Sequence, residues 1–133
     1  MNNYYQYDLY RSIPNTNHLY NPKEGYLRGN LFKNLYSPYK NYEVKRFNPR
    51  SDKERCFIEL SELSFAMHEL NLYLDLHPED QSMFMLFKDY REKLAMMMNE
   101  YENKYGPINI NTNTMNNSFT WVNSSWPWEE YNV

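Results

Sequence analysis

Few residues of this 133-residue chain have the chemistry of a catalytic or metal site, because it contains only three His and one Cys. His68-Glu69 could open a His-Glu-x-x-His zinc motif, but Leu72 stands where the second His is required. A helix-bundle di-iron site requires Glu-x-x-His, and Phe65 stands at the Glu position ahead of His68. We therefore predict that the chain has no catalytic residue, no bound cofactor and no metal site.

Other polar patterns lead to the same expectation. The run from His77 to Asp80 departs from the His-Pro-Asp tripeptide of J-domain cochaperones, because Glu79 stands between Pro78 and the Asp. Glu59 and Glu62 are more typical of a solvated helix face than of a pair of catalytic acids. Cys56, as the lone Cys, can form no intrachain disulfide and suits a buried apolar position. We predict a protein that is not an enzyme.

Charge is distributed unevenly along the chain. Residues 1–50 carry a net charge of +5, residues 51–106 carry −6 and residues 107–133 carry −2. This division predicts that the basic arm docks on an acidic surface of its own chain or of a partner. A net charge of +5 over 50 residues is too low to neutralise many backbone phosphates, so we expect no nucleic-acid binding. No stretch reaches transmembrane length and the first 20 residues lack a signal-peptide apolar run, so we expect no membrane association.

The elements that position these residues follow from two apolar series that mirror each other about Pro78-Glu79. Spacings of four and three residues place each series on one face of a helix. The first series is Cys56, Leu60, Leu63, Met67, Leu70 and Leu74, and the second is Met83, Phe87, Tyr90, Leu94, Met97 and Tyr101. We predict an all-α fold in which helices over residues 52–76 and 78–105 form an antiparallel hairpin, with these side chains as its seam.

Capping residues set the limits of the hairpin. Ser51 or Asp52 is expected to cap the first helix, and Pro78 suits the first turn of the second. Gly106 is expected as a left-handed cap, followed by the helix-blocking Pro107. We therefore divide the chain into three segments. They are an extended aromatic arm with one short helical turn (1–50), the hairpin (51–106), and a polar linker with a Trp-rich tail (107–133).

A second apolar stripe, formed by Ile58, Phe65 and Leu72, recurs every seven residues on the face opposite the seam. Two helices alone bury too little apolar surface to offset the entropy of ordering them. We expect the arms, another copy of the chain and a different protein all to contribute to covering the stripe. The predicted partner-binding residues are Ile58, Phe65, Leu72, Phe32, Tyr36, Tyr39, Trp121, Trp126 and Trp128.

Three sequence blocks resemble the CotJB family of bacterial spore coat proteins. They are the run from Glu69 to Asp80 (ELNLYLDLHPED), Tyr101-x-x-x-Tyr-Gly-Pro107, and Trp126-Pro-Trp-Glu129, and they occur in the family's order. The resemblance covers about residues 52–130. It implies a structural role in the endospore coat, after synthesis in the mother-cell cytoplasm, and it implies no catalytic residues.

Residues 13–39 are similar to CotJA, which is encoded beside CotJB in the same operon. The similarity lies in Ile13-Pro14, in Leu19-Tyr-x-Pro-x-Glu24 and in the run from Leu27 to Tyr39, where Asn30 and Lys33 depart from the expected Thr and Pro. The implied partners are other coat proteins, including the manganese-catalase-like protein of that operon, with self-association as a further option.

That operon also provides an alternative function, an accessory subunit of a metal-dependent, catalase-like redox complex. This alternative would require His18, His68 or His77 to converge with carboxylates in the folded chain.

Overall fold

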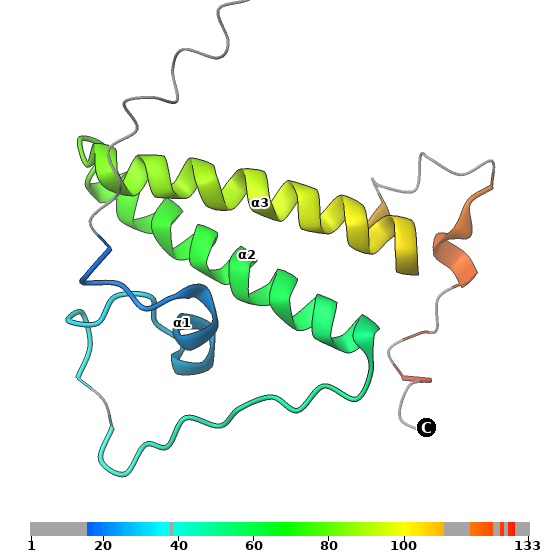
Figure 1. Ribbon diagram of the computed structural model, residues 1–133, viewed down its shortest axis with the longest axis horizontal. Helices are drawn as coiled ribbons and strands as arrows, with labels where there is room; N and C mark the ends of the chain where they lie inside the picture. Colours follow the sequence, from blue (N-terminus) through cyan, green and yellow to red (C-terminus); the bar gives the residue numbers. More distant parts are fainter. Residues whose placement is uncertain (1–15, 38, 111–117, 124–125, 127, 130–133) are drawn as a thin grey trace, which may run out of the picture.

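A computed structural model describes residues 16–37, 39–110, 118–123, 126 and 128–129 (Figure 1). In chain order the elements are α1 (Pro22–Arg28), α2 (Asp52–Leu76), α3 (Gln81–Tyr105) and the short 3-10 helix η4 (Thr120–Asn123). The described residues contain no strand, only an isolated antiparallel bridge between Leu19 and Phe32. The predicted all-α class is therefore confirmed.

Helix α2 begins and ends at the predicted residues. The Ser51 hydroxyl accepts a hydrogen bond from the Glu54 N–H at 3.1 Å, which makes Ser51 the N-cap. The Glu54 carboxylate in turn accepts a bond from the Arg50 N–H at 2.6 Å. At the other end, the His77 N–H donates to the Tyr73 carbonyl and closes the helix. These local bonds explain why the limits of α2 can be read from the sequence.

Helix α3 begins at Gln81, so the predicted start at residue 78 is wrong by three residues. Pro78 lies instead in the turn that joins the two helices, where the Asp80 N–H donates to the His77 carbonyl at 3.1 Å. The Asp80 carboxylate accepts from the Met83 N–H at 3.1 Å and caps the helix. The start of α3 is therefore determined by Asp80, whose carboxylate accepts from a free N–H of the first turn. This capping bond outweighs the preference of Pro78 for the first turn of a helix.

Helix α3 ends at Tyr105, as predicted, but the geometry of its cap differs from the expectation. Gly106 has φ 104° and ψ 173°, which lies outside the left-handed helical region predicted for it. Pro107 disfavours a helical ψ at the residue before it, so Gly106 has an extended ψ. Its φ is positive, and glycine is the residue that adopts this pair of angles without steric strain.

Helices α2 and α3 pack side by side and run in opposite directions from the turn between them (Figure 1). All twelve seam residues lie in two apolar clusters, one near the turn and one near the open end of the pair. Met83, early in α3, shares the first cluster with Leu70, late in α2, whereas Tyr101 shares the second with Leu60. The seam prediction is confirmed, and Ala66 and Leu86 join it as buried residues that the two series did not include.

The arm contributes a third layer, built around the seven-residue helix α1. The Asn21 side chain caps α1, Pro22 opens it, and Gly29 ends it with φ 70° and ψ 21°. The short helical turn predicted in this segment is thus confirmed. Leu31, which follows α1 in the chain, packs against Gly25. A β-carbon at Gly25 would lie only 3.1 Å from a Leu31 methyl group. The absence of a side chain at Gly25 therefore lets the chain fold back on α1.

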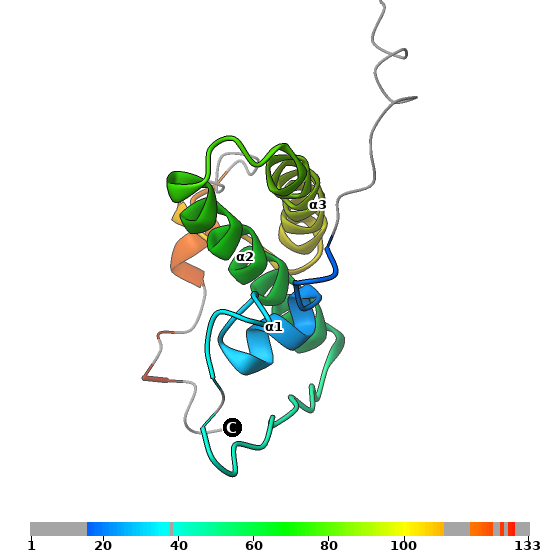
Figure 2. The same ribbon diagram turned by 90° about the vertical axis from the view of Figure 1, so that its left-hand side faces the viewer.

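The arm docks on α2 through two leucines that share the core near the turn. Leu31 is fully buried and Leu19 is 5% exposed, and both belong to the cluster that contains Ala66 and Leu70. The Leu31 N–H also lies 3.4 Å from a Glu69 carboxylate oxygen. Figure 2 shows α1 lying against α2 on the side away from α3. The arm and the helix pair consequently share one apolar core.

Candidate interaction site

The arm covers part of the predicted second stripe. The ring of Tyr26 meets Phe65 edge-on at a centroid distance of 5.8 Å, and Phe65 is half-buried. Ile58 is also half-buried and lines a small pocket together with Phe47 of the arm. Leu72 is 49% exposed. A residual apolar position therefore remains at Leu72, toward the turn.

Three of the predicted partner-binding residues lie in the arm. One of them packs within the chain and the other two are exposed. Phe32 stacks on Tyr73 of α2 at 5.0 Å and joins the core near the turn. Tyr36 is 67% exposed and Tyr39 is 87% exposed. The two tyrosines are thus available to a partner, whereas Phe32 attaches the arm to its own chain.

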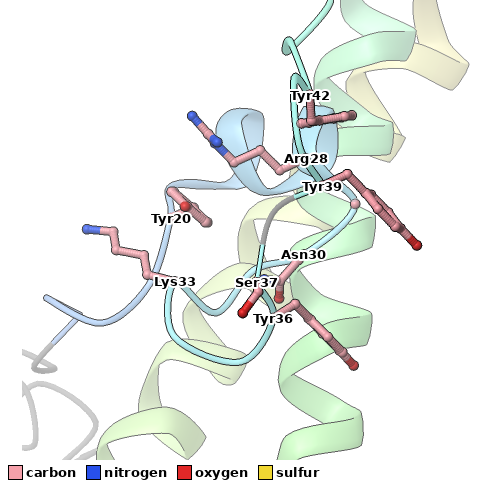
Figure 3. A pocket seen from close by; sticks show the side chains of 9 residues that line it. Tyr20, Arg28, Asn30, Lys33, Tyr36, Ser37, Tyr39 and Tyr42 are labelled. Atoms are coloured by element: carbon pink, nitrogen blue, oxygen red, sulfur yellow. The ribbon is translucent and has the colours of Figure 1, made fainter.

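Tyr36 and Tyr39 line an open pocket of about 480 Å³ on the outer side of the arm (Figure 3). We call it the arm pocket. Its lining residues are Tyr20, Arg28, Gly29, Asn30, Lys33, Tyr36, Ser37, Tyr39 and Tyr42. Two of them are cations, four carry phenol rings and none is a carboxylate, so the pocket favours an acidic and aromatic ligand.

Helix α1 and the bridge hold the two cations of the arm pocket beside one ring. The Arg28 guanidinium lies 4.8 Å and the Lys33 ammonium 5.8 Å from the centroid of the Tyr20 ring. The Tyr20 N–H donates to the Leu31 carbonyl at 2.8 Å, while the Lys33 N–H donates to the His18 carbonyl at 3.0 Å. The fold therefore brings together Tyr20, Arg28 and Lys33, none of which is among the partner-binding residues predicted from the sequence.

The Trp-rich tail forms a compact local turn with exposed rings. The rings of Trp126 and Trp128 stack almost parallel, with their centroids 5.0 Å apart. The two residues are 58% and 68% exposed. The Glu129 N–H donates to the Trp126 carbonyl at 2.8 Å, and the Trp126 N–H donates to the Glu129 carboxylate at 2.9 Å. We call these three residues the Trp–Glu turn. Trp121 lies in η4, and its side chain is outside the described residues.

The turn between α2 and α3 is closed by polar and aromatic contacts around Tyr73. The Tyr73 hydroxyl donates a hydrogen bond to the Asp80 carboxylate at 2.9 Å. The His77 ring packs against the Tyr73 ring, with the two centroids 4.4 Å apart. The bond to Asp80, then burial, raises the pKa of Tyr73. These contacts account for the His77–Asp80 run as a structural turn.

Glu62 is buried, so the prediction that it lies on a solvated helix face is wrong. It is 9% exposed and lines the same small pocket as Lys23 and Ile58. Burial raises its pKa, the nearby Lys23 opposes that rise, and Glu59 adds to it. The arm causes this burial by packing over α2, and helical periodicity alone carries no signal of it.

No group of three or more His, Cys, Asp or Glu side chains with the spacing of a metal site occurs among the described residues. Cys56 is half-buried at the open end of the seam and belongs to the cluster of Leu60 and Tyr101. Within the same part of the chain, no helix is both long and apolar enough to span a membrane. The candidate interaction site consists of the exposed tyrosines of the arm pocket and the exposed rings of the Trp–Glu turn.

Comparison with known proteins gives one family match. The family model described as CotJB protein matches residues 54–129, which is more than half of the chain. No curated protein and no protein of solved structure matches. The matched region contains α2, α3 and the Trp–Glu turn but not residues 13–39, so the likeness of that segment to CotJA stays a prediction.

Proposed function

Because the chain belongs to the CotJB family of spore coat proteins, we propose that it is a non-enzymatic structural component of the endospore coat. The family match over residues 54–129 is the observation that carries this proposal. In it, α2 and α3 serve as the scaffold, while the arm and the tail present the side chains that bind neighbouring coat proteins. The chain would be made in the mother-cell cytoplasm and then incorporated into the coat.

The exposed aromatic residues support an assembly role. Tyr39, Trp126 and Trp128 are all more than half exposed. Exposed Tyr and Trp side chains are typical of the residues that dominate the energetics of protein interfaces. The proposed partner-binding residues are Tyr36, Tyr39, Trp126 and Trp128, with Leu72 as the exposed part of the second stripe. Phe32, Ile58 and Phe65 would act mainly by holding the arm in place.

We further propose that one partner is the manganese-catalase-like coat protein implied by the family resemblance. Leu72 and Leu76 lie one turn apart on α2 and are 49% and 79% exposed, so they would give that partner an apolar contact outside the arm pocket. This binding is distinct from the coat role itself, and the two are tested separately.

Fractionation of purified spores tests the coat role. A tagged chain expressed under its own promoter is expected in the alkali- and detergent-extractable coat fraction and at the spore periphery by immunogold labelling. Recovery only from the spore core, or from vegetative cells, would overturn the proposal. A pull-down from sporulating cells tests the partner, and repeated failure to recover the catalase-like protein would remove that partner without affecting the coat role.

A further inference from the structure

The arm pocket and the Trp–Glu turn have complementary chemistry and lie on different parts of the molecule. We propose that the arm pocket of one copy of the chain binds the Trp–Glu turn of a second copy, so that chains join head to tail. The interaction would pair Arg28 and Lys33 with Glu129 and would place the two Trp rings among the tyrosines of the pocket.

Charge complementarity is the first argument. The tail segment, residues 107–133, carries −2, and its only charged side chains are Glu129 and Glu130. The pocket presents Arg28 and Lys33 with no lining carboxylate. Arg28 is paired with Glu24 at 3.3 Å through one nitrogen, but a guanidinium has five donors, so this pair does not saturate it. A carboxylate from a second chain can therefore still bind there.

The ring surfaces are the second argument. Trp126 and Trp128 expose more than half of their surface as a stacked pair, which is costly to leave in water. Indole rings are the strongest aromatic partners of Arg and Lys, and the pocket already holds both cations near a ring. The pocket volume of about 480 Å³ lies within the range of clefts that bind small ligands.

The positions of the two surfaces favour a second copy over the chain's own tail. Figure 1 shows α1 below the part of α2 nearer the turn, whereas η4 and the red tail residues that follow it lie beyond the open end of the helix pair. A single contact between two different surfaces leaves one pocket and one turn of the pair unused, so further copies add until the chain of molecules closes into a ring or continues as an open filament. Head-to-tail binding therefore predicts assemblies larger than a dimer that form as the concentration rises.

Mixing two variants of the full-length chain tests the proposal. The pocket variant is Arg28→Glu/Lys33→Glu, and the turn variant is Trp126→Ala/Trp128→Ala. In sedimentation velocity, the wild type is expected to form species larger than a dimer as its concentration rises. Each variant alone is expected to associate roughly tenfold or more weakly, because the interface loses its main anchors. An equimolar mixture should form a dimer and nothing larger, since only one intact pocket and one intact turn can meet.

Matched controls separate this contact from general charge effects and from misfolding. Lys53→Glu/Arg91→Glu makes the same charge change on exposed positions of α2 and α3 and should associate like the wild type. Far-UV circular dichroism checks folding, and Arg28→Gln/Lys33→Gln replaces the pocket variant if charge reversal against Glu24 unfolds α1. The turn variant alters only exposed side chains, so it stays informative in either case.

Three outcomes would overturn the proposal. One is a wild type that stays monomeric at all concentrations, as expected if its own tail fills the pocket. Another is a turn or pocket variant that associates as strongly as the wild type. The third is a mixture of the variants that remains monomeric. This inference extends the assembly role proposed above, but its failure would leave localisation in the coat unaffected, because that localisation is measured in spores.

Discussion

Tyr73 joins the arm, α2 and the inter-helix turn through one side chain. Its ring stacks on Phe32, and its hydroxyl donates to Asp80. We expect Tyr73→Phe to lower the free energy of unfolding by about 1.5–3 kcal/mol, because a hydrogen bond to a charged acceptor is lost. Urea unfolding at pH 7 measures this, with the exposed Tyr36→Phe as the control. A Phe variant as stable as the wild type would show that the bond contributes nothing.

Leu31 is the anchor of the arm, because its side chain is fully buried against α2. Leu31→Ala should destabilise the folded chain by about 2–5 kcal/mol through lost burial and a cavity. Leu35→Ala, four residues later and 60% exposed, should change stability by less than about 0.5 kcal/mol. Equal unfolding midpoints for the two variants would mean that the arm is not part of the cooperative core.

Glu62 should give the folded chain a specific pH dependence. Burial raises its pKa above the ordinary 4.5, so the folded chain binds this proton more tightly than the unfolded chain. The penalty for ionised Glu62 is therefore complete above the raised pKa and disappears as the pH falls below 4.5. Glu62→Gln should be more stable than the wild type at pH 7 and should lose this advantage at pH 4.

Urea titrations of both proteins at the two pH values measure this difference. The exposed Glu92→Gln on α3 is the control and should show a much smaller change, because Glu92 is not among the charges that shift the pKa of Glu62. A Gln variant that is less stable than the wild type at pH 7 would mean that the attraction of Lys23 outweighs burial.

At the scale of elements, the sequence predicts most accurately where local signals determine the structure. Helix α2 has both limits as expected because Ser51 caps it and its apolar series runs out at the turn. The seam between α2 and α3 can also be predicted, because apolar residues spaced by four and three form a stripe that packs against a helix with the same spacing. These features depend only on neighbours within one or two turns of a helix.

The start of α3 and the docking of the arm depend on contacts that such signals do not contain. Asp80 begins α3 because its carboxylate binds both the Met83 N–H and the Tyr73 hydroxyl. Leu19 and Leu31 have no periodic pattern around them, so their burial arises from the bridge between Leu19 and Phe32. The arm pocket depends on the same bridge, so the local sequence around Arg28 and Lys33 does not predict it.

The double role of Asp80 gives a prediction at this scale. Ser51→Ala removes a cap from α2 and should cost about 0.5–2 kcal/mol. Asp80→Ala removes the cap of α3 and the acceptor of Tyr73, so it should cost more. In a double-mutant cycle by urea unfolding, Asp80→Ala and Tyr73→Phe should be non-additive, because both remove the same bond. Strict additivity would argue that the two side chains act independently.

At the scale of the whole molecule, the arm both completes the core and presents the surface offered to partners. Its inner side buries Leu19 and Leu31, while its outer side exposes Tyr36 and Tyr39. Any partner that binds the outer side would therefore also favour the docked state of the arm, by mass action. Folding and assembly are expected to reinforce each other in this chain.

Removing residues 1–50 tests this coupling directly. The fragment 51–133 would expose the core near the turn, where Ala66, Leu70 and Met83 are almost completely buried in the full chain. We expect a lower Tm by circular dichroism, increased binding of a hydrophobic dye, and non-specific association that raising the salt concentration strengthens. The head-to-tail contact of the full chain should instead weaken with salt, because it pairs opposite charges. A fragment that melts at the wild-type Tm and binds no dye would show that the helix pair forms its own complete core. The arm would then act only as a binding segment, and its burial against α2 would not contribute to stability.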